Sequence, residues 1–308
     1  MKELSALDTP VVLVVYRRPK QTIKVFKQIA RVRPRKLYLI ADGPKPDKGE
    51  EEKCKKVREI VSVVDWPCNI KRIYAEKNMG SKYRVSSGID NVFKHEEKAI
   101  ILEDDCLPDI TFFRYCQELL YKYENDERIY MISGYNPLGK YNHQKTSYFF
   151  SVQGTWGWAT WRRAWKKFEI EIPKFSQVIY RNKMENFFNG NIKLIKDLEQ
   201  GCLAVLEKGI DAWDYQWQFA CAVNNGLTIY PSINLIKNIG FGTDATHTFN
   251  TKNILSKTEL FSMSFPLIHN EHVQLDTKFI DQFYSHLEKN KTKRLYGSIA
   301  RKLKIIKQ

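Results

Sequence analysis

A short apolar run followed by three consecutive carboxylates decides the fold: Lys98-Ala-Ile-Ile-Leu-Glu103-Asp104-Asp105-Cys-Leu-Pro-Asp109. Its apolar part has the length and composition of a buried strand. Three like charges at the end of such a strand are unfavourable unless a positive group lies beside them. A divalent cation at the carboxyl edge of an α/β sheet meets this requirement. The alternative is a solvated acidic turn before a helix, with Asp109 as the N-cap.

On both sides of this segment, apolar runs alternate with stretches of helical periodicity. The runs predict strands at residues 11–16, 36–41, 69–74, 98–102 and 129–133. The periodic stretches predict helices at residues 22–29, 53–64, 81–93 and 110–123. This alternation predicts an α/β fold with a mostly parallel, Rossmann-like sheet and helices on both faces. After about residue 140 it stops, and the chain shows helical segments at 191–208 and 211–222 and a short strand at 228–231.

The length of the chain limits the number of its domains, and its net charge indicates which class of partner it binds. The 308 residues are enough for one large domain or two small ones. We expect a catalytic domain at 1–270, made of a nucleotide-binding half (1–135) and an acceptor half (136–270), followed by a basic helical tail at 271–308. The net charge of +15 and the pI of about 9.4 favour anionic partners, namely nucleotide diphosphates, anionic lipid or nucleic acid. The sequence contains no recognisable nucleic-acid-binding motif, so nucleic acid is not an expected partner.

The cysteine pattern and the N-terminal residues indicate the cellular compartment in which we expect the protein. Six cysteines are scattered without a C-x-x-C pair, which indicates neither a zinc site nor a disulfide framework. Residues 1–10 lack the apolar core of a signal peptide, and the first apolar run is too short to span a bilayer. We therefore expect a cytoplasmic protein.

Other polar residues follow the predicted strands. Asp42 ends the second strand, where it could accept from a base or ribose or form an ordinary Asp-Gly turn. Arg17 and Arg18 follow the first strand and could meet phosphate. Asp214 lies between Trp213 and Tyr215, and partial desolvation there would raise its pKa and suit a general base. A plain helix N-cap is the alternative for Asp214.

Two further features are less specific. His247 lies in a loop with Gly240 and Gly242, where it could bind metal or phosphate, although a lone loop histidine more often has no special role. The tryptophans between residues 156 and 165 could stack on sugar rings or form part of the core.

In this order, the motifs resemble those of GT-A glycosyltransferases, in particular bacterial sugar transferases related to the N-acetylglucosaminyltransferase I type. The resemblance rests on Val14-Val-Tyr-Arg-Arg18, Ile40-Ala-Asp42-Gly43, Glu103-Asp104-Asp105, Gly157-Trp158-Ala-Thr-Trp-Arg-Arg-Ala-Trp165, Trp213-Asp214, and the segment from Ile229-Tyr-Pro231 to His247. Tyr215 departs from the family pattern, which has an acidic residue at that position.

The resemblance implies a role for each matching residue. Arg18, Asp42, Glu103, Asp104 and Trp213 would contact the nucleotide sugar. Asp105 would bind Mn²⁺ or Mg²⁺, with His247 as a second candidate ligand, and Asp214 would act as the base in a direct, inverting displacement.

We therefore expect a metal-dependent inverting glycosyltransferase that uses a UDP-sugar and a glycan or lipid-linked acceptor in surface polysaccharide synthesis. The alternatives are a nucleotidyltransferase acting on a sugar phosphate, a non-enzymatic nucleic-acid-binding protein, and a glycoside hydrolase, which needs two carboxylates but no metal.

The basic C-terminus suggests where such an enzyme would work. Leu295, Ile299, Leu303 and Ile306 fall on one helical face, which predicts peripheral contact with anionic lipid on the inner face of the plasma membrane. A solvated or frayed terminus is the alternative.

Overall fold

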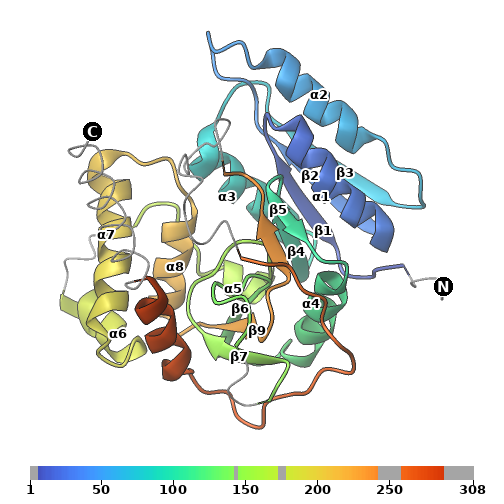
Figure 1. The fold of residues 1–308 in the computed structure, drawn as a ribbon. Coiled ribbons are helices and arrows are strands. Elements are labelled where there is room, and N and C mark those ends of the chain that lie inside the picture. Colours follow the sequence, from blue (N-terminus) through green and yellow to red (C-terminus); the bar gives the residue numbers. More distant parts are fainter. Residues whose placement is uncertain (1–5, 142–144, 173–177, 242–257, 288–308) are drawn as a thin grey trace, which may run out of the picture.

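The computed structural model describes residues 6–141, 145–172, 178–241 and 258–287 (Figure 1). The strands are β1 (Val11–Val15), β2 (Lys36–Ala41), β3 (Asn69–Tyr74), β4 (Lys98–Glu103), β5 (Cys106–Pro108), β6 (Ile129–Ser133), β7 (Tyr148–Ser151), β8 (Trp158–Trp161), β9 (Leu227–Pro231) and β10 (Ile236–Asn238). The helices are α1 (Pro19–Val32), α2 (Glu51–Ser62), α3 (Gly80–Phe93), α4 (Thr111–Lys122), α5 (Arg162–Trp165), α6 (Val178–Phe187), α7 (Ile192–Lys208) and α8 (Asp214–Val223). Residues 277–287 form a further helix.

Within these ranges, an eight-stranded sheet has the order β3-β2-β1-β4-β8-β6-β9-β7. The first four strands are parallel to one another, β6 and β9 are also parallel, and β8 and β7 run antiparallel to their neighbours. The predicted α/β class with a mostly parallel sheet is therefore confirmed.

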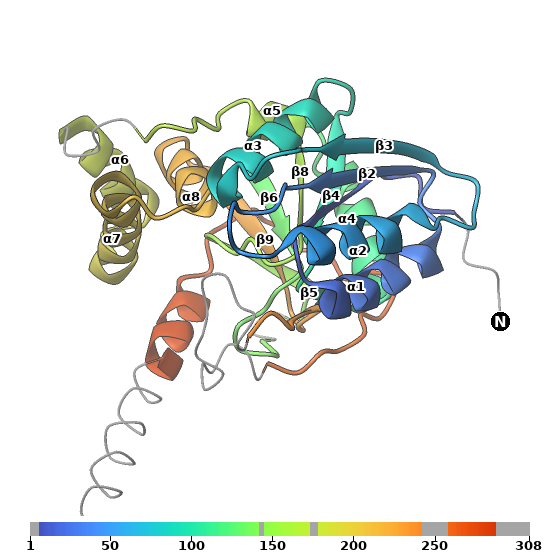
Figure 2. The same cartoon turned by 90° about the horizontal axis from the view of Figure 1, so that it is seen from above.

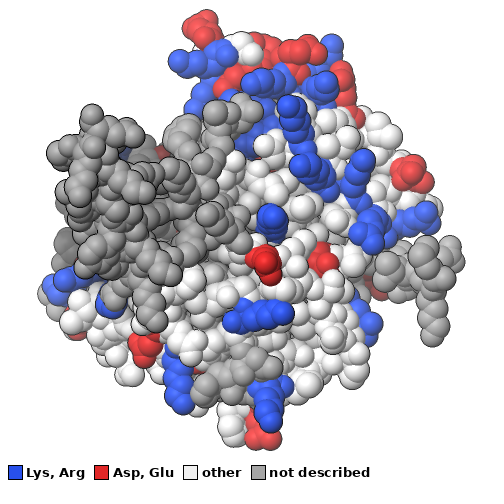
Figure 3. Space-filling view, in the orientation of Figure 1, with Lys and Arg blue, Asp and Glu red and all other residues white. Residues whose placement is uncertain are grey.

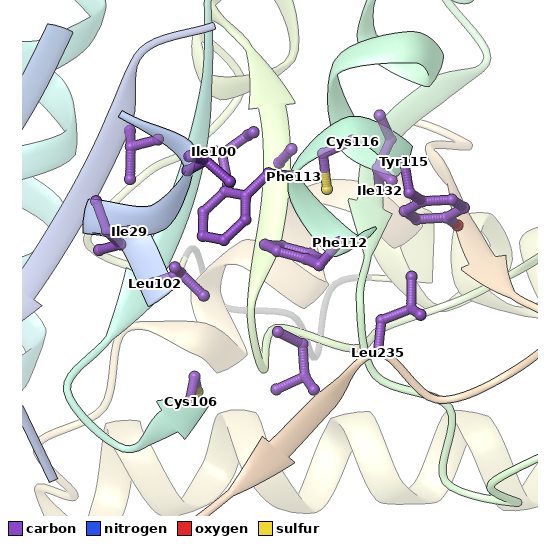
Figure 4. Packing of buried hydrophobic residues seen from close by; sticks show 14 of the residues in the cluster. Ile29, Ile100, Leu102, Cys106, Phe112, Phe113, Tyr115, Cys116, Ile132 and Leu235 are labelled. Atoms are coloured by element: carbon purple, nitrogen blue, oxygen red, sulfur yellow. The ribbon is translucent and has the colours of Figure 1, made fainter. Parts of the chain in front are cut away.

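Helices cover both faces of the sheet (Figure 2). Alternate residues of β1 point to opposite faces: Leu13 packs in a cluster with residues of α1, α2 and α4, whereas Val12 and Val14 pack in a cluster with residues of α3, α5 and α8. All five residues of β1 are buried, as expected of a central strand in a covered parallel sheet. Figure 4 shows Phe112 and Phe113 of α4 among the buried side chains of the first cluster.

A third cluster joins α6, α7 and α8 to the helix at 277–287 and includes Phe149 of β7 and Tyr230 of β9. Phe279 and Ile280 are buried there, and the Tyr284 hydroxyl donates to Asp197 of α7 at 2.7 Å. Residues 277–287, which the sequence assigns to the tail, thus pack against α7. The amphipathic stretch predicted at 289–308 lies outside the described residues.

The second half of the chain contains strands that the sequence analysis missed. β7 and β8 belong to the main sheet, and β10 pairs with β5 in a two-stranded ribbon. Periodicity gave no signal because β8 is buried throughout and only four residues long. Trp158, Trp161 and Trp165 are buried, so the core alternative holds for these three tryptophans.

The described surface is strongly charged. Figure 3 shows lysine and arginine side chains spread over one face, with acidic side chains gathered at the top of the view, over α2.

No helix within the described ranges is long and apolar enough to cross a bilayer.

Two buried asparagines fix the path from β9 to β10. Asn234 accepts from the Asn136 backbone N–H at 2.9 Å, and its own amide donates to the carbonyls of Ile236 and Glu259 at 2.7 and 2.8 Å. Asn136 in turn donates to the Pro231 carbonyl at 2.8 Å. These bonds pair backbone groups that would otherwise be buried without partners.

We expect Asn234→Ala to lower the free energy of unfolding by about 2–4 kcal/mol, because it leaves several buried backbone groups unpaired. Chemical denaturation followed by fluorescence measures the change. Asn182→Ala, at an exposed position of α6, is the matched control and should change stability by less than about 0.5 kcal/mol. Equal stability of the two variants would contradict the role assigned to Asn234.

Candidate active site

The strand order creates a crevice at one edge of the sheet. β1 lies between β2 and β4, and the chain leaves β1 toward β2 on one side and returns on the other side as β4. Ligands of open α/β sheets bind at such switch points, outside the carboxyl ends of the strands. A cavity of about 540 Å³ lies here. Its lining includes Tyr16, Arg18, Asp42, Lys45, Asn78, Gly80, Ser81, Arg84, Glu103, Asp104, Asp105, Thr155, Trp156, Asp211, Trp213, Asp214, Asn238 and Gly240.

The acidic residues after β4 form one wall of this cavity. Arg18 donates to Asp104 at 3.2 Å and to Asp105 at 2.6 Å. Asp104 also accepts from the Tyr16 backbone N–H at 3.1 Å. Arg18 is therefore a positive group beside the acidic motif, and it links the end of β1 to the end of β4.

One arginine does not balance these charges. Burial, together with the nearby charges of Asp105, Asp214 and Asp104, raises the pKa of Glu103 to about 8. Burial also raises the pKa of Asp104 to about 6, although Arg18 acts against it. Burial acts to lower the pKa of Arg18, but the carboxylates outweigh it and raise the value. Burial is the largest cause of the raised pKa of both Glu103 and Asp104, and the neighbouring carboxylates add to it.

The donor set fits a hard divalent cation that is held partly by a ligand. Carboxylate oxygens suit Mg²⁺ and Mn²⁺, and such ions often take one or two carboxylates together with substrate phosphates. Among the described residues, no three His, Cys, Asp or Glu side chains form a ready-made metal cage. The assignment of Asp105 as a ligand of such an ion stays a prediction. His247 lies outside the described residues.

The start of α8 brings Asp214 to the same cavity. Trp213, the residue before the helix, is buried and stacks on Trp158 with ring centroids 5.5 Å apart. Asp214 is the first residue of α8, and its charge contributes to the raised pKa of Glu103. The tryptophan packing therefore fixes a carboxylate opposite the acidic motif.

Asp42, directly after β2, also lines the cavity, and its carboxylate oxygens already accept four hydrogen bonds from the protein. It accepts from the backbone N–H groups of Gly43, Met79 and Gly80 at 2.8, 2.8 and 3.0 Å, and from the Asn78 side-chain amide at 3.0 Å. A carboxylate has about four lone-pair sites. Asp42 thus holds the turn before α3 and the first residue of that helix, and its contact with a nucleotide stays a prediction.

The sequence analysis missed Asp211 as a site residue. It accepts from the backbone N–H groups of Ser81 and Lys82, which lie 130 and 129 residues earlier in the chain, at 2.8 and 2.7 Å. Together with Asp42 it caps the N-terminus of α3. A Cβ on Gly80 would lie 2.6 Å from an oxygen of Asp211, which explains the glycine. Sequence alone shows only that an aspartate lies three residues before Asp214.

The segment after β10 passes directly over Asp105. The Ile239 backbone N–H donates to the Asp105 carbonyl at 2.8 Å, and a Cβ on Gly240 would lie 2.1 Å from a carboxylate oxygen of Asp105. The ribbon of β5 and β10 places this backbone there. Gly240, predicted as part of a loop with His247, therefore lies at the acidic wall.

Fold and site together define an α/β protein with an acidic pocket at the switch point of its sheet. A scan with family models and a search of curated proteins found no match.

Solved structures show distant likenesses. A UDP-glucose pyrophosphorylase complexed with UDP-glucose is 10% identical, covers 48% of this chain and has a TM-score of 0.27. This chain spans 64% of that protein, less than two thirds of its length. A mannosyltransferase from Pyrobaculum calidifontis in complex with GDP-Man and Mn²⁺ is 11% identical, over 72% of this chain and 75% of the other, with a TM-score of 0.39.

A 4-diphosphocytidyl-2C-methyl-D-erythritol synthase from Anaerococcus prevotii is 10% identical, over 59% of this chain and 84% of the other, with a TM-score of 0.34. At these identities and TM-scores, the likenesses assign neither a family nor an activity to this chain.

We expect Arg18→Met to lower the free energy of unfolding by about 3 kcal/mol, because it leaves Asp104 and Asp105 without their cation in a mostly buried wall. The measurement is denaturation in the presence of a chelator, so that no divalent ion replaces the lost charge. Arg31→Met, at an exposed position of α1, should change stability by less than about 0.5 kcal/mol. If Arg18→Met is as stable as the wild type, the ion pairs of Arg18 with Asp104 and Asp105 contribute nothing to the free energy of unfolding.

Proposed function

We propose that this protein is a metal-dependent inverting glycosyltransferase with a GT-A fold, which transfers a sugar from a nucleotide diphosphate to a hydroxyl group. The observation that carries the proposal is that Glu103, Asp104, Asp105 and Asp214 share one cavity with the ion-paired Arg18 at the switch point of the sheet. Such a cavity can take a metal–diphosphate and still offer a carboxylate as base.

The residues divide into two groups along the cavity. At the acidic wall, Asp105 would hold Mn²⁺ or Mg²⁺ against the diphosphate, and the bound ion would act as a Lewis acid that stabilises the leaving diphosphate. Arg18 keeps Asp104 and Asp105 in place, and Glu103 and Asp104 would face the sugar and ribose. Trp213 forms a rigid wall that positions Asp214.

Asp214 is the proposed general base. It would take the proton from the acceptor hydroxyl while that oxygen attacks the anomeric carbon. The bond from the anomeric carbon to the diphosphate oxygen breaks in the same step, so the configuration at the anomeric carbon inverts. Asp42 and Asp211 hold the first turn of α3 along the side of the cavity.

The identity of the substrates rests on the sequence resemblance. It favours a UDP-sugar as donor and a glycan or lipid-linked acceptor of a surface polysaccharide. Work on the cytoplasmic side of a membrane, with the basic C-terminus at the lipid surface, belongs to the same proposal.

The first experiment is calorimetric titration of UDP, GDP and CDP with and without Mn²⁺, on the wild type and on Asp105→Ala. We expect metal-dependent binding of at least one nucleotide, weakened at least tenfold by the substitution, because Asp105 is the proposed ligand of the ion. Binding of no nucleotide under either condition would contradict the proposal.

Asp214→Asn should reduce the rate of sugar transfer by a factor of about 10²–10⁴ while leaving nucleotide binding within about twofold, because the amide cannot accept the proton. Release of nucleoside diphosphate from a panel of nucleotide sugars measures the rate. Asp65→Asn, an exposed position before β3, is the control. Full activity of Asp214→Asn would remove this residue from the role of base.

Consumption of a nucleoside triphosphate with release of pyrophosphate by the wild type would instead identify a nucleotidyltransferase.

A further inference from the structure

Helix α1 presents a continuous basic surface to solvent. Its exposed cations, which we call the basic stripe, are Lys20, Lys24, Lys27 and Arg31. In an α-helix these four positions fall within an arc of about 60° and span about 16 Å. The buried residues of the helix lie on the opposite side and are Thr22, Val25, Phe26, Ile29 and Val32. In Figure 3, a band of lysine and arginine side chains runs over the position that α1 has in Figure 1.

The protein does not balance the charge of the basic stripe. Residues 9–41 contain nine lysines and arginines and no aspartate or glutamate. Within the described ranges, Lys20, Lys24 and Lys27 form no ion pair, and Arg31 donates to the neutral side chain of Gln28 at 2.9 Å. The neighbouring helix α2 differs, because three glutamates lie among its lysines. The charge of the stripe is therefore available to an external anionic partner.

One apolar side chain lies beside these cations. Ile23 is 40% exposed and lies about one turn from both Lys20 and Lys27. A helix that lies on a bilayer combines cations with an apolar side chain that enters the boundary between headgroups and acyl chains. A protein that binds single-stranded nucleic acid instead stacks bases on exposed aromatic side chains. The one aromatic residue of α1, Phe26, is buried, so the surface favours anionic lipid over nucleic acid.

The position of α1 suits contact with a membrane. The helix starts directly after Arg18, which lines the cavity, so the basic stripe begins beside the candidate active site. Figures 1 and 2 place α1 and the helix at 277–287 on the same side of the molecule. The sequence from Lys289 onward is basic. The chain thus enters its basic C-terminal sequence on the side that carries the stripe.

We propose that the basic stripe of α1 docks the protein on a bilayer that contains anionic phospholipid, with Ile23 entering the headgroup boundary. Docking through α1 holds the cavity beside the lipid surface, where the polar head of a lipid-linked molecule lies. This inference goes beyond the proposed function, because it requires neither nucleotide binding nor the predicted membrane contact of residues 289–308.

The test is co-sedimentation of the full chain with large unilamellar vesicles, made of phosphatidylcholine alone or of phosphatidylcholine and phosphatidylglycerol in equal parts. The proteins compared are the wild type, Lys24→Gln/Lys27→Gln and the control Lys55→Gln/Lys56→Gln, which removes the same charge from exposed positions of α2.

We expect the wild type to bind only the anionic vesicles. The α1 variant should lower the partition coefficient by about tenfold or more, because each basic residue at an anionic surface contributes about a factor of five. The control should stay within about twofold of the wild type, because the glutamates of α2 weaken the attraction of that helix to anionic lipid.

Equal weakening by the two double variants would show that the vesicles respond to net charge alone, and it would overturn the assignment to α1. An α1 variant that binds as tightly as the wild type would overturn it too, as would a wild type that does not bind anionic vesicles. Tighter binding to a single-stranded oligonucleotide than to vesicles, lost in the same variant, would identify nucleic acid as the partner instead.

Ile23→Ser supplies a second readout. It should weaken vesicle binding by about threefold or more at both low and high salt, because salt screens the contribution of the lysines but not an apolar contact. Unchanged binding of Ile23→Ser would overturn the insertion of this side chain. All substituted residues are exposed, so the variants should keep the unfolding temperature and the nucleotide affinity of the wild type. Failure of the proposed function is distinguishable, since it appears as a loss of nucleotide binding in every protein compared.

Discussion

The burial of like charges at the carboxyl end of β4 is the constraint on which the rest of the site depends. Three consecutive carboxylates there would repel one another without a nearby cation. The protein supplies Arg18, which spans from the end of β1 to Asp104 and Asp105. Burial, together with the neighbouring carboxylates, still raises the pKa values of Glu103 and Asp104. The proposed metal–nucleotide ligand would bring a cation to these buried carboxyl groups.

The N-terminus of helix α3 forms another part of the cavity wall. The N-terminus of a helix attracts anions because its first backbone N–H groups lack partners. In this protein the carboxylates of Asp42 and Asp211 meet that demand from two distant parts of the chain. A ligand in the cavity therefore meets side chains of α3, such as Ser81 and Arg84, rather than free backbone N–H groups of this helix.

The second half of the chain contributes the parts that complete the site. The buried stacking of Trp213 on Trp158 fixes the start of α8. The β5–β10 ribbon places Gly240 in close contact with Asp105. Both arrangements rely on packing of aromatic or glycine residues far apart in the sequence. These supports matter for the proposed role of Asp214 as a base, because a catalytic carboxylate must be held close to its productive position.

The sequence by itself determined the parallel half of the fold. The bounds of β2, β3 and β6 agree with the predicted strands, because apolar runs between turn residues carry a strong local signal. It also placed Arg18, Asp42 and the acidic motif at strand ends, and parallel strands bring such ends to one edge. Only the tertiary structure decided the positions of β7, β8 and β10, the capping role of Asp211 and the burial of Arg84 without an ion-pair partner among the described residues. Each of these depends on contacts between segments far apart in the chain, and no local pattern of residues encodes such contacts.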